Sequence, residues 1–161
     1  MKHHLYIACG IIIALSTLST CTTVTQPKKS EGSTALTTKV WLISGYAPTG
    51  TLLPIEPGHG SSARLILQGN NTLSGTTGSY TFEGTWKAGK PNAAGEFPFS
   101  AVITKVQGQE PANAIASRFE ADLIRLLKKT SFVRLGRGNI HLMDKNKAPT
   151  LQYIHRSADA P

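Results

Sequence analysis

The sequence predicts an α+β domain that is mainly antiparallel β: a curved sheet or small barrel of about seven strands, covered or plugged by one amphipathic helix. Two observations lead to this fold class. Short segments rich in β-branched and aromatic residues recur along the chain, separated by clusters of Gly, Asn and Pro. A single stretch between residues 111 and 129 instead repeats its apolar residues at helical spacing.

Three strands are predicted in the first half of the domain. Residues 40–44 and 63–67 are rich in large apolar side chains, and the Pro- and Gly-containing residues 46–60 between them predict a long loop. Gly69-Asn70-Asn71 predicts a turn. Residues 79–86 then alternate between a largely aromatic face and a polar face, which predicts a half-buried strand.

The second half of the domain contains the helix and four more strands. The apolar face of the helix consists of Ile115, Phe119, Leu123, Leu126 and Leu127. Pro111 suits its first turn, and Lys128 and Lys129 in the last turn complement the helix dipole. The four strands are predicted at residues 97–104, 132–135, 139–143 and 151–155. Polar residues 144–147 supply a hairpin turn between the last two strands.

The N-terminus resembles the signal peptide of a bacterial lipoprotein. Lys2 begins a short basic region, and the apolar residues 7–15 are too few to span a bilayer core, which needs roughly 20 residues. Leu18-Ser19-Thr20-Cys21 then resembles a lipobox, in which cleavage precedes a cysteine that becomes acylated. We therefore expect lipid on Cys21. An ordinary secretory signal with an incidental Cys21 is the alternative.

These features divide the chain into four parts. They are a lipoprotein signal peptide at residues 1–20, a flexible lipid-anchored tether at 21–38, a folded domain at 39–156 and a C-terminal tail at 157–161. The tether is predicted because its many Thr, Ser, Lys and Gly residues offer little apolar surface to bury. Thr22 stands where Asp often signals retention at an inner membrane. The expected location is therefore the bacterial cell envelope, lipid-anchored in the outer membrane and facing the periplasm.

The chain is strongly basic, with 17 Lys and Arg residues against 9 Asp and Glu residues. In the envelope this charge attracts anionic partners, so we expect contact with lipid headgroups, an anionic envelope polymer or an acidic envelope protein. Nucleic acid is excluded as a partner because the chain carries an export signal and no nucleic-acid-binding motif. The densest basic group, Lys128, Lys129, Arg134 and Arg137, is the predicted anionic-partner surface. An ordinary solvated face is the alternative.

No catalytic, metal or cofactor site is predicted. Cys9 leaves with the signal peptide and Cys21 carries lipid, so no thiol remains for catalysis or zinc. His141 alternates with apolar neighbours and should face outward. Glu120 is expected to support the helix or to pair with a neighbouring strand. A hydrolase is the least favoured alternative, because it needs Ser61, a histidine and an acid to meet in space.

The order and spacing of several short motifs resemble the META domain, the family that includes the HslJ heat-shock lipoproteins. The motifs are Trp41-Leu42-Ile43, Gly69-Asn70-Asn71, Gly78-Ser79-Tyr80-Thr81-Phe82-Glu83-Gly84, Ile103-Thr104-Lys105-Val106, Phe119-Glu120-x-x-Leu123-x-x-x-Leu127 and Ile140-x-Leu142-x-Asp144. The resemblance covers residues 39–156. The chain departs from the family at Asn70, where many members have cysteine, and it also lacks their second cysteine ahead of the helix.

This resemblance implies a β-rich domain with one helix and a link to stress response or drug tolerance, without an established enzymatic reaction. We therefore expect a non-enzymatic META-like binding domain. The family fold also resembles secretin-pilot lipoproteins, which hold lipid in a central cavity. The alternative is accordingly a pilot-like or lipid-holding chaperone, in which Trp41, Phe82, Trp86 and Leu123 surround a gap that takes an acyl chain.

Overall fold

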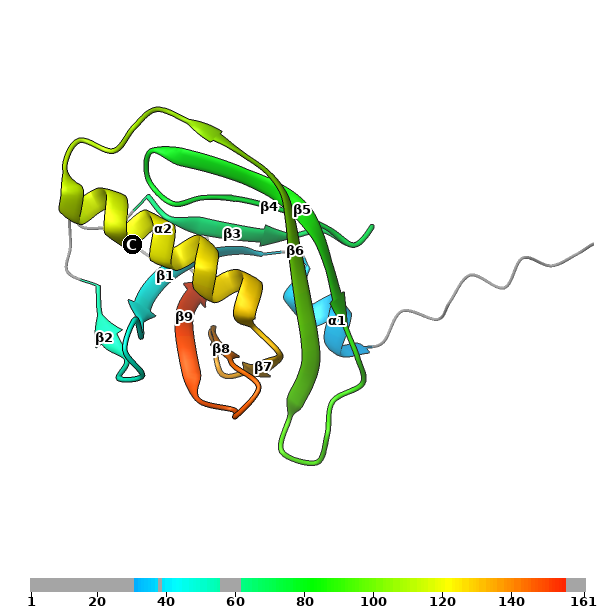
Figure 1. Cartoon of the computed structure of the whole chain (residues 1–161). Coiled ribbons are helices and arrows are strands. Elements are labelled where there is room, and N and C mark those ends of the chain that lie inside the picture. The colour runs from blue at the N-terminus through cyan, green and yellow to red at the C-terminus, as the bar shows by residue number, and fades with distance from the viewer. Residues whose placement is uncertain (1–30, 38, 56–61, 156–161) are drawn as a thin grey trace, which may run out of the picture.

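The computed structural model describes residues 31–37, 39–55 and 62–155 as nine strands and two helices. The elements are α1 (Glu31–Leu36), β1 (Val40–Tyr46), β2 (Leu53–Pro54), β3 (Arg64–Leu67), β4 (Thr72–Thr76), β5 (Tyr80–Ala88), β6 (Glu96–Gly108), α2 (Ala114–Lys129), β7 (Phe132–Leu135), β8 (Asn139–Met143) and β9 (Pro149–His155). They confirm a mainly antiparallel α+β fold (Figure 1). No helix in these three segments is long and apolar enough to cross a membrane.

The strands form one antiparallel sheet that closes on itself. Their order is β2-β1-β3-β4-β5-β6-β7-β8-β9, and β1 also pairs with β9. Two strands add to the seven predicted. The two-residue β2 lies inside the predicted loop, and β4 directly follows the predicted turn. β4 has a single large apolar residue, Leu73, and so gives little periodic signal; it is a strand because β3 and β5 pair with it on both sides.

The two edges of β6 are paired unequally. β5 pairs with β6 from Phe99 to Gly108, whereas β7 pairs only with Glu96, Phe97 and Pro98. α2 runs across the concave side of the sheet and contacts both β6 and β9 (Figure 1). The helix therefore covers the side on which β6 and β7 diverge.

α2 begins later than predicted. Pro111 precedes the helix, and Asn113 is its N-cap, with a side-chain oxygen that accepts a hydrogen bond from the Ala116 N–H at 2.9 Å. The buried residues of the helix are Glu120, Leu123, Leu126 and Leu127. Ile115 was predicted on this face, but it is exposed because it lies in the first turn, ahead of the part that packs on the sheet.

The core is one cluster of buried side chains. Trp41, Phe82, Trp86 and Leu123 all belong to it, and the Trp86 ring stacks on Phe99 with the centroids 6.0 Å apart. The pilot-like alternative predicts that Trp41, Phe82, Trp86 and Leu123 surround a gap. That detail is corrected by the structure: they are buried in the cluster, and none of them lines either of the clefts described below.

The predicted tether, residues 21–38, is wrong near its C-terminal end. α1 occupies part of it, and Leu36 is 0 % exposed within the core. The indole Nε1–H of Trp41 donates a hydrogen bond to the Leu36 carbonyl oxygen at 3.0 Å. The polar composition conceals this one buried leucine, whose hydrogen-bond partner belongs to the next strand. Residues 21–30, including Cys21, lie outside the described residues.

Leu36→Ala is expected to lower the free energy of unfolding by about 2–5 kcal/mol, because it removes buried methyl groups and leaves a cavity. Urea denaturation followed by tryptophan fluorescence measures the change. Val40→Ala shortens an exposed aliphatic side chain nearby and should cost less than about 1 kcal/mol. Equal losses in the two variants would contradict the docking of α1 into the core.

Candidate functional site

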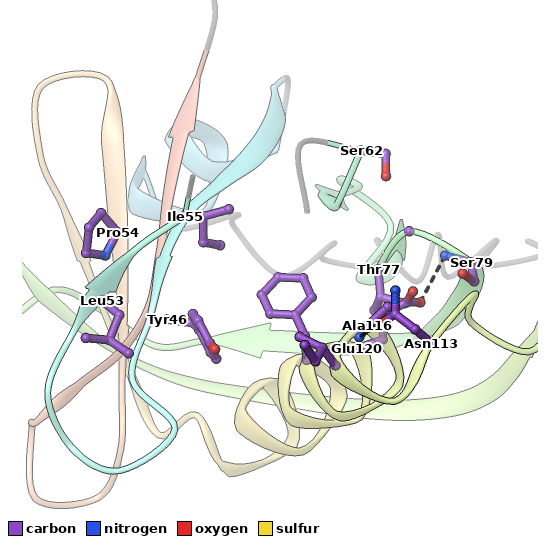
Figure 2. Close-up of a pocket in the computed structure, with 13 residues that line it drawn as sticks. Tyr46, Leu53, Pro54, Ile55, Ser62, Thr77, Ser79, Asn113, Ala116 and Glu120 are labelled. Atoms are coloured by element: carbon purple, nitrogen blue, oxygen red, sulfur yellow. Dashed lines mark hydrogen bonds between the residues drawn. The ribbon is translucent and has the colours of Figure 1, made fainter. Parts of the chain in front are cut away.

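A cleft of about 570 Å³ lies between β1 and β2, the first half of α2, and the connection from β4 to β5. Figure 2 shows Tyr46, Leu53 and Ile55 on one side of this cleft and Thr77 and Ser79 on the other. One side is therefore mainly apolar and the other carries hydroxyl and main-chain groups. We refer to the whole space as the β2–α2 cleft.

The apolar side of the β2–α2 cleft is built around two aromatic rings. Tyr46 and Phe119 meet edge to face, with centroids 5.0 Å apart and ring planes at 88°. Leu53 and Ile115 stand exposed at the rim, and 74 % of the Ile115 surface is accessible. Exposed apolar side chains beside a concave surface are typical of a binding site.

The polar side is organised by the buried carboxylate of Glu120. Its Oε2 accepts hydrogen bonds from the Thr77 hydroxyl at 2.6 Å, the Ser79 N–H at 2.9 Å and the Tyr80 N–H at 3.2 Å. Glu120 therefore joins α2 to the start of the neighbouring strand, which agrees with the expectation from the sequence. Burial of a carboxylate is costly unless donors surround it, and these three donors meet that requirement.

Gly78 lets the chain turn around this carboxylate. Its φ of 131° is rare for residues with a side chain, and an added Cβ would lie 3.0 Å from the Glu120 Oε1. The sequence contained a signal for this arrangement: Glu120 is the only charged residue on the buried face of α2. Its donors, however, lie about 40 residues earlier in the chain, so local pattern does not reveal them.

The four residues of the predicted anionic-partner surface differ in their contacts. Lys128 and Lys129 border a second cleft beside α2. Arg134 on β7 instead forms a salt bridge with the buried Glu96, and Arg137 is exposed between β7 and β8. Of these four residues, only the two lysines line this second cleft, and Arg134 is paired with Glu96 while about half of its side chain stays exposed.

Glu96 is held by two cations and an amide. Lys147 donates to its Oε2 at 2.8 Å, Arg134 donates to Oε1, and the side-chain amide of Asn92 donates to Oε2 at 3.1 Å. The hydrogen bond from Lys147, followed by those from Arg134 and Asn92, lowers the pKa of Glu96 to about 2. This carboxylate therefore ties β6 and β7 to two turns.

The described residues bring together no group of three or more His, Cys, Asp or Glu side chains. His141 is half-buried on the face of β8 opposite to Ile140, and its pKa is lowered by burial and then by the charge of Arg134. Ser61 lies outside the described residues. The hydrolase alternative therefore stays an untested prediction.

Asn70 is the residue at which the predicted resemblance to the META domain departs from that family. Its Oδ1 accepts hydrogen bonds from the Thr72 N–H at 3.1 Å and the Thr72 hydroxyl at 2.6 Å, and the following Asn71 has a φ of 67°. Asn70 thus stabilises the turn between β3 and β4, as turn-forming Asn residues commonly do.

No protein-family model matches the sequence, and no curated protein matches it significantly. The fold is similar to that of a DUF4847 family protein from Bacteroides vulgatus ATCC 8482, with a TM-score of 0.55 and 15 % identity over 77 % of this chain and 96 % of that one. It is also similar to a protein solved by NMR, with a TM-score of 0.50 and 15 % identity over 76 % and 92 % of the two chains. At this level of identity the likeness shows the fold alone.

Gly78→Ala is expected to lower the free energy of unfolding by about 1–3 kcal/mol, because the new Cβ adopts a strained φ and crowds Glu120. Gly50→Ala is the matched control, since Gly50 has a φ of 100° with nothing within 4 Å of an added Cβ. In a double-mutant cycle, the losses from Gly78→Ala and Glu120→Ala should not add. Additive losses would show that Gly78 and the carboxylate are uncoupled.

Stability should fall in acid because of Glu96. Its pKa is lowered from 4.5 to about 2 on folding, so the ionised group stabilises the fold above its ordinary pKa. This contribution is lost as the pH falls from about 5 towards 2. We expect the urea midpoint to drop less over this range in Glu96→Gln than in the parent. Glu83→Gln changes an exposed carboxylate and should keep the parent profile; an identical profile for Glu96→Gln would refute the assignment.

Proposed function

We propose that this chain is a lipid-anchored protein of the bacterial envelope, acylated at Cys21, whose domain binds an envelope component in the β2–α2 cleft without catalysing a reaction. The observation that carries the proposal is the two-sided lining of that cleft. Tyr46, Phe119 and the exposed Ile115 offer apolar contact, and Glu120 fixes the opposite wall. The anchor places the cleft in the periplasm, at the outer membrane.

The chemistry of the cleft favours binding over reaction. Glu120 is the one carboxylate among the described residues that line this cleft, and three donors already engage its Oε2. A carboxylate held in this way is fixed in position, and it serves the fold first. What the cleft offers to a ligand is apolar area at Leu53 and Ile115, whose burial is favourable by roughly 25 cal/mol per Å².

The resemblance to the META domain stays a prediction. It supports a non-enzymatic, HslJ-like role in stress response or drug tolerance, and it rests on the motifs of residues 39–156. The two structures with a similar fold neither strengthen nor weaken it, since their descriptions concern other families or none.

A pilot-like or lipid-holding chaperone is the second candidate. Its supporting observation is the same apolar wall, because an acyl chain held between Tyr46, Leu53 and Ile115 would lie in an open cleft rather than in the packed core. The two candidates differ in what occupies the cleft. An envelope protein or polymer is expected in the first, and a lipid in the second.

Native mass spectrometry of the full-length protein, gently extracted from its own cells, tests the proposal. We expect a chain cleaved before Cys21, heavier by its acyl groups, together with a co-isolated envelope protein or polymer. A co-isolated lipid of defined mass, beyond the covalent acyl groups, would instead favour the chaperone. A bare acylated monomer would contradict binding in the cleft but leave the anchor standing.

Two variants separate the anchor from the cleft. Cys21→Ser should abolish acylation and release the protein from the membrane fraction; unchanged fractionation would refute the anchor. Ile115→Asp should keep the anchor and lose the co-isolated mass, because it places a charge on the apolar rim. Val102→Asp is the matched control, since Val102 is an exposed aliphatic residue of β6 that does not line the cleft.

A further inference from the structure

β6 leaves part of one edge without a strand partner. The Phe99 N–H donates to the Ser131 carbonyl oxygen at 2.8 Å, and this is the last main-chain hydrogen bond on that edge of β6 among the described residues. From Ala101 to Gly108 only β5 pairs with β6. In an antiparallel ladder, alternate residues direct their N–H and C=O groups away from the partner, so this segment presents main-chain groups for another strand.

A groove of about 500 Å³ adjoins this open edge. One wall is the face of α2 that carries Ala121, Ile124 and Lys128, and the other wall is Val106 with Tyr80. We refer to it as the β6–α2 groove. Its helical wall, from residues 120 to 129, extends about 13 Å, which is the length of roughly four extended residues.

Both walls of the β6–α2 groove carry apolar side chains. Val106 lies opposite Phe82, so it points to the concave side of the sheet, yet it is 46 % exposed. Ile124 packs against the core from the helix and also lines the groove. An apolar residue that faces inward and still meets solvent marks a place where the domain leaves its own interior uncovered.

The end of the groove is positively charged. Lys128 and Lys129 line it and take part in none of the three salt bridges found within the described residues. Arg125 also lines the groove, and its charge is offset by Asp122 at 2.7 Å. Glu120 is the one acidic residue of the lining, and its Oε2 is engaged by three donors.

We propose that the open edge of β6 and the β6–α2 groove bind an extended, acidic segment of a partner protein by strand addition. Main-chain hydrogen bonds to β6 hold the segment, alternate apolar side chains pack on Val106 and Ile124, and acidic side chains meet Lys128 and Lys129. Charge complementarity selects an acidic segment, and the unpaired edge selects an extended protein chain. This site shares only Glu120 with the lining of the β2–α2 cleft and does not depend on the function proposed for that cleft.

The test uses a random peptide display library selected on the full-length lipidated protein in detergent micelles. Enrichment of sequences that alternate apolar and acidic residues is expected. Selection of no peptides, or of peptides without acidic residues, would overturn the proposal. A synthetic copy of the most enriched peptide then serves in binding titrations.

Three variants place the peptide on the structure. Val106→Asp and the double variant Lys128→Glu/Lys129→Glu should each raise the Kd roughly tenfold or more. Val102→Asp is the control for the first, because Val102 is 57 % exposed and lies opposite Thr85, on the other face of β6. The lysine variant changes exposed positions only, and so keeps the test decisive where Val106→Asp unfolds the domain. Unchanged affinity in the lysine variant would overturn the proposal.

Backbone methylation distinguishes strand addition from attraction between charges alone. Two versions of the peptide carry N-methyl groups on alternate amides, in opposite phase. One version loses the N–H groups that face β6 and should lose binding, whereas the other should keep it. Equal binding of both versions would exclude a strand-addition site. Ile115→Asp should leave the peptide Kd unchanged, which separates this result from any failure of the β2–α2 cleft.

Discussion

β6 pairs with β5 from Phe99 to Gly108 but with β7 at only three residues, and the rest of the molecule is arranged around that inequality. The sheet closes on its other side through β1 and β9, so no further strand of the described residues covers the opening beside β6. α2 covers part of this opening, and Glu120 fixes the helix to the start of β5. The β2–α2 cleft and the β6–α2 groove both result from this placement of the helix, because each is a space between α2 and the sheet that the helix does not fill.

The sequence predicted those elements whose signal is local. The alternation in residues 79–86 and the helical spacing that ends at Leu127 correspond to β5 and α2. It missed the elements that exist because of their neighbours. β4 is a strand between two others, and α1 is ordered because Leu36 meets Trp41. Neither the strands that pair with β4 nor the contact between Leu36 and Trp41 can be recognised from a window of adjacent residues.

The candidate site was less predictable than the fold, for the same reason. Tyr46, Phe119 and Gly78 come from separate parts of the chain and meet only when the sheet closes over α2. The basic group was grouped by nearness in sequence, and its role as one anionic-partner surface stays a prediction. Arg134 is paired with Glu96, 38 residues earlier in the chain, and that carboxylate partly offsets its charge. The composition gives the number of charges in a chain, but the ion pairs formed in the fold determine which of them remain available to a partner.

If Cys21 carries the proposed lipid, the docking of Leu36 also limits how far the domain can stand from the membrane. A linker made of all residues 21–38 would have a fully extended length of about 60 Å, at roughly 3.5 Å for each residue. Because α1 is fixed to the core through Leu36, the linker from the proposed lipid on Cys21 to Glu31 is at most about 35 Å long. Under the proposed anchor, the domain would stay in a shallow layer next to the bilayer, and a partner would have to enter that layer to bind.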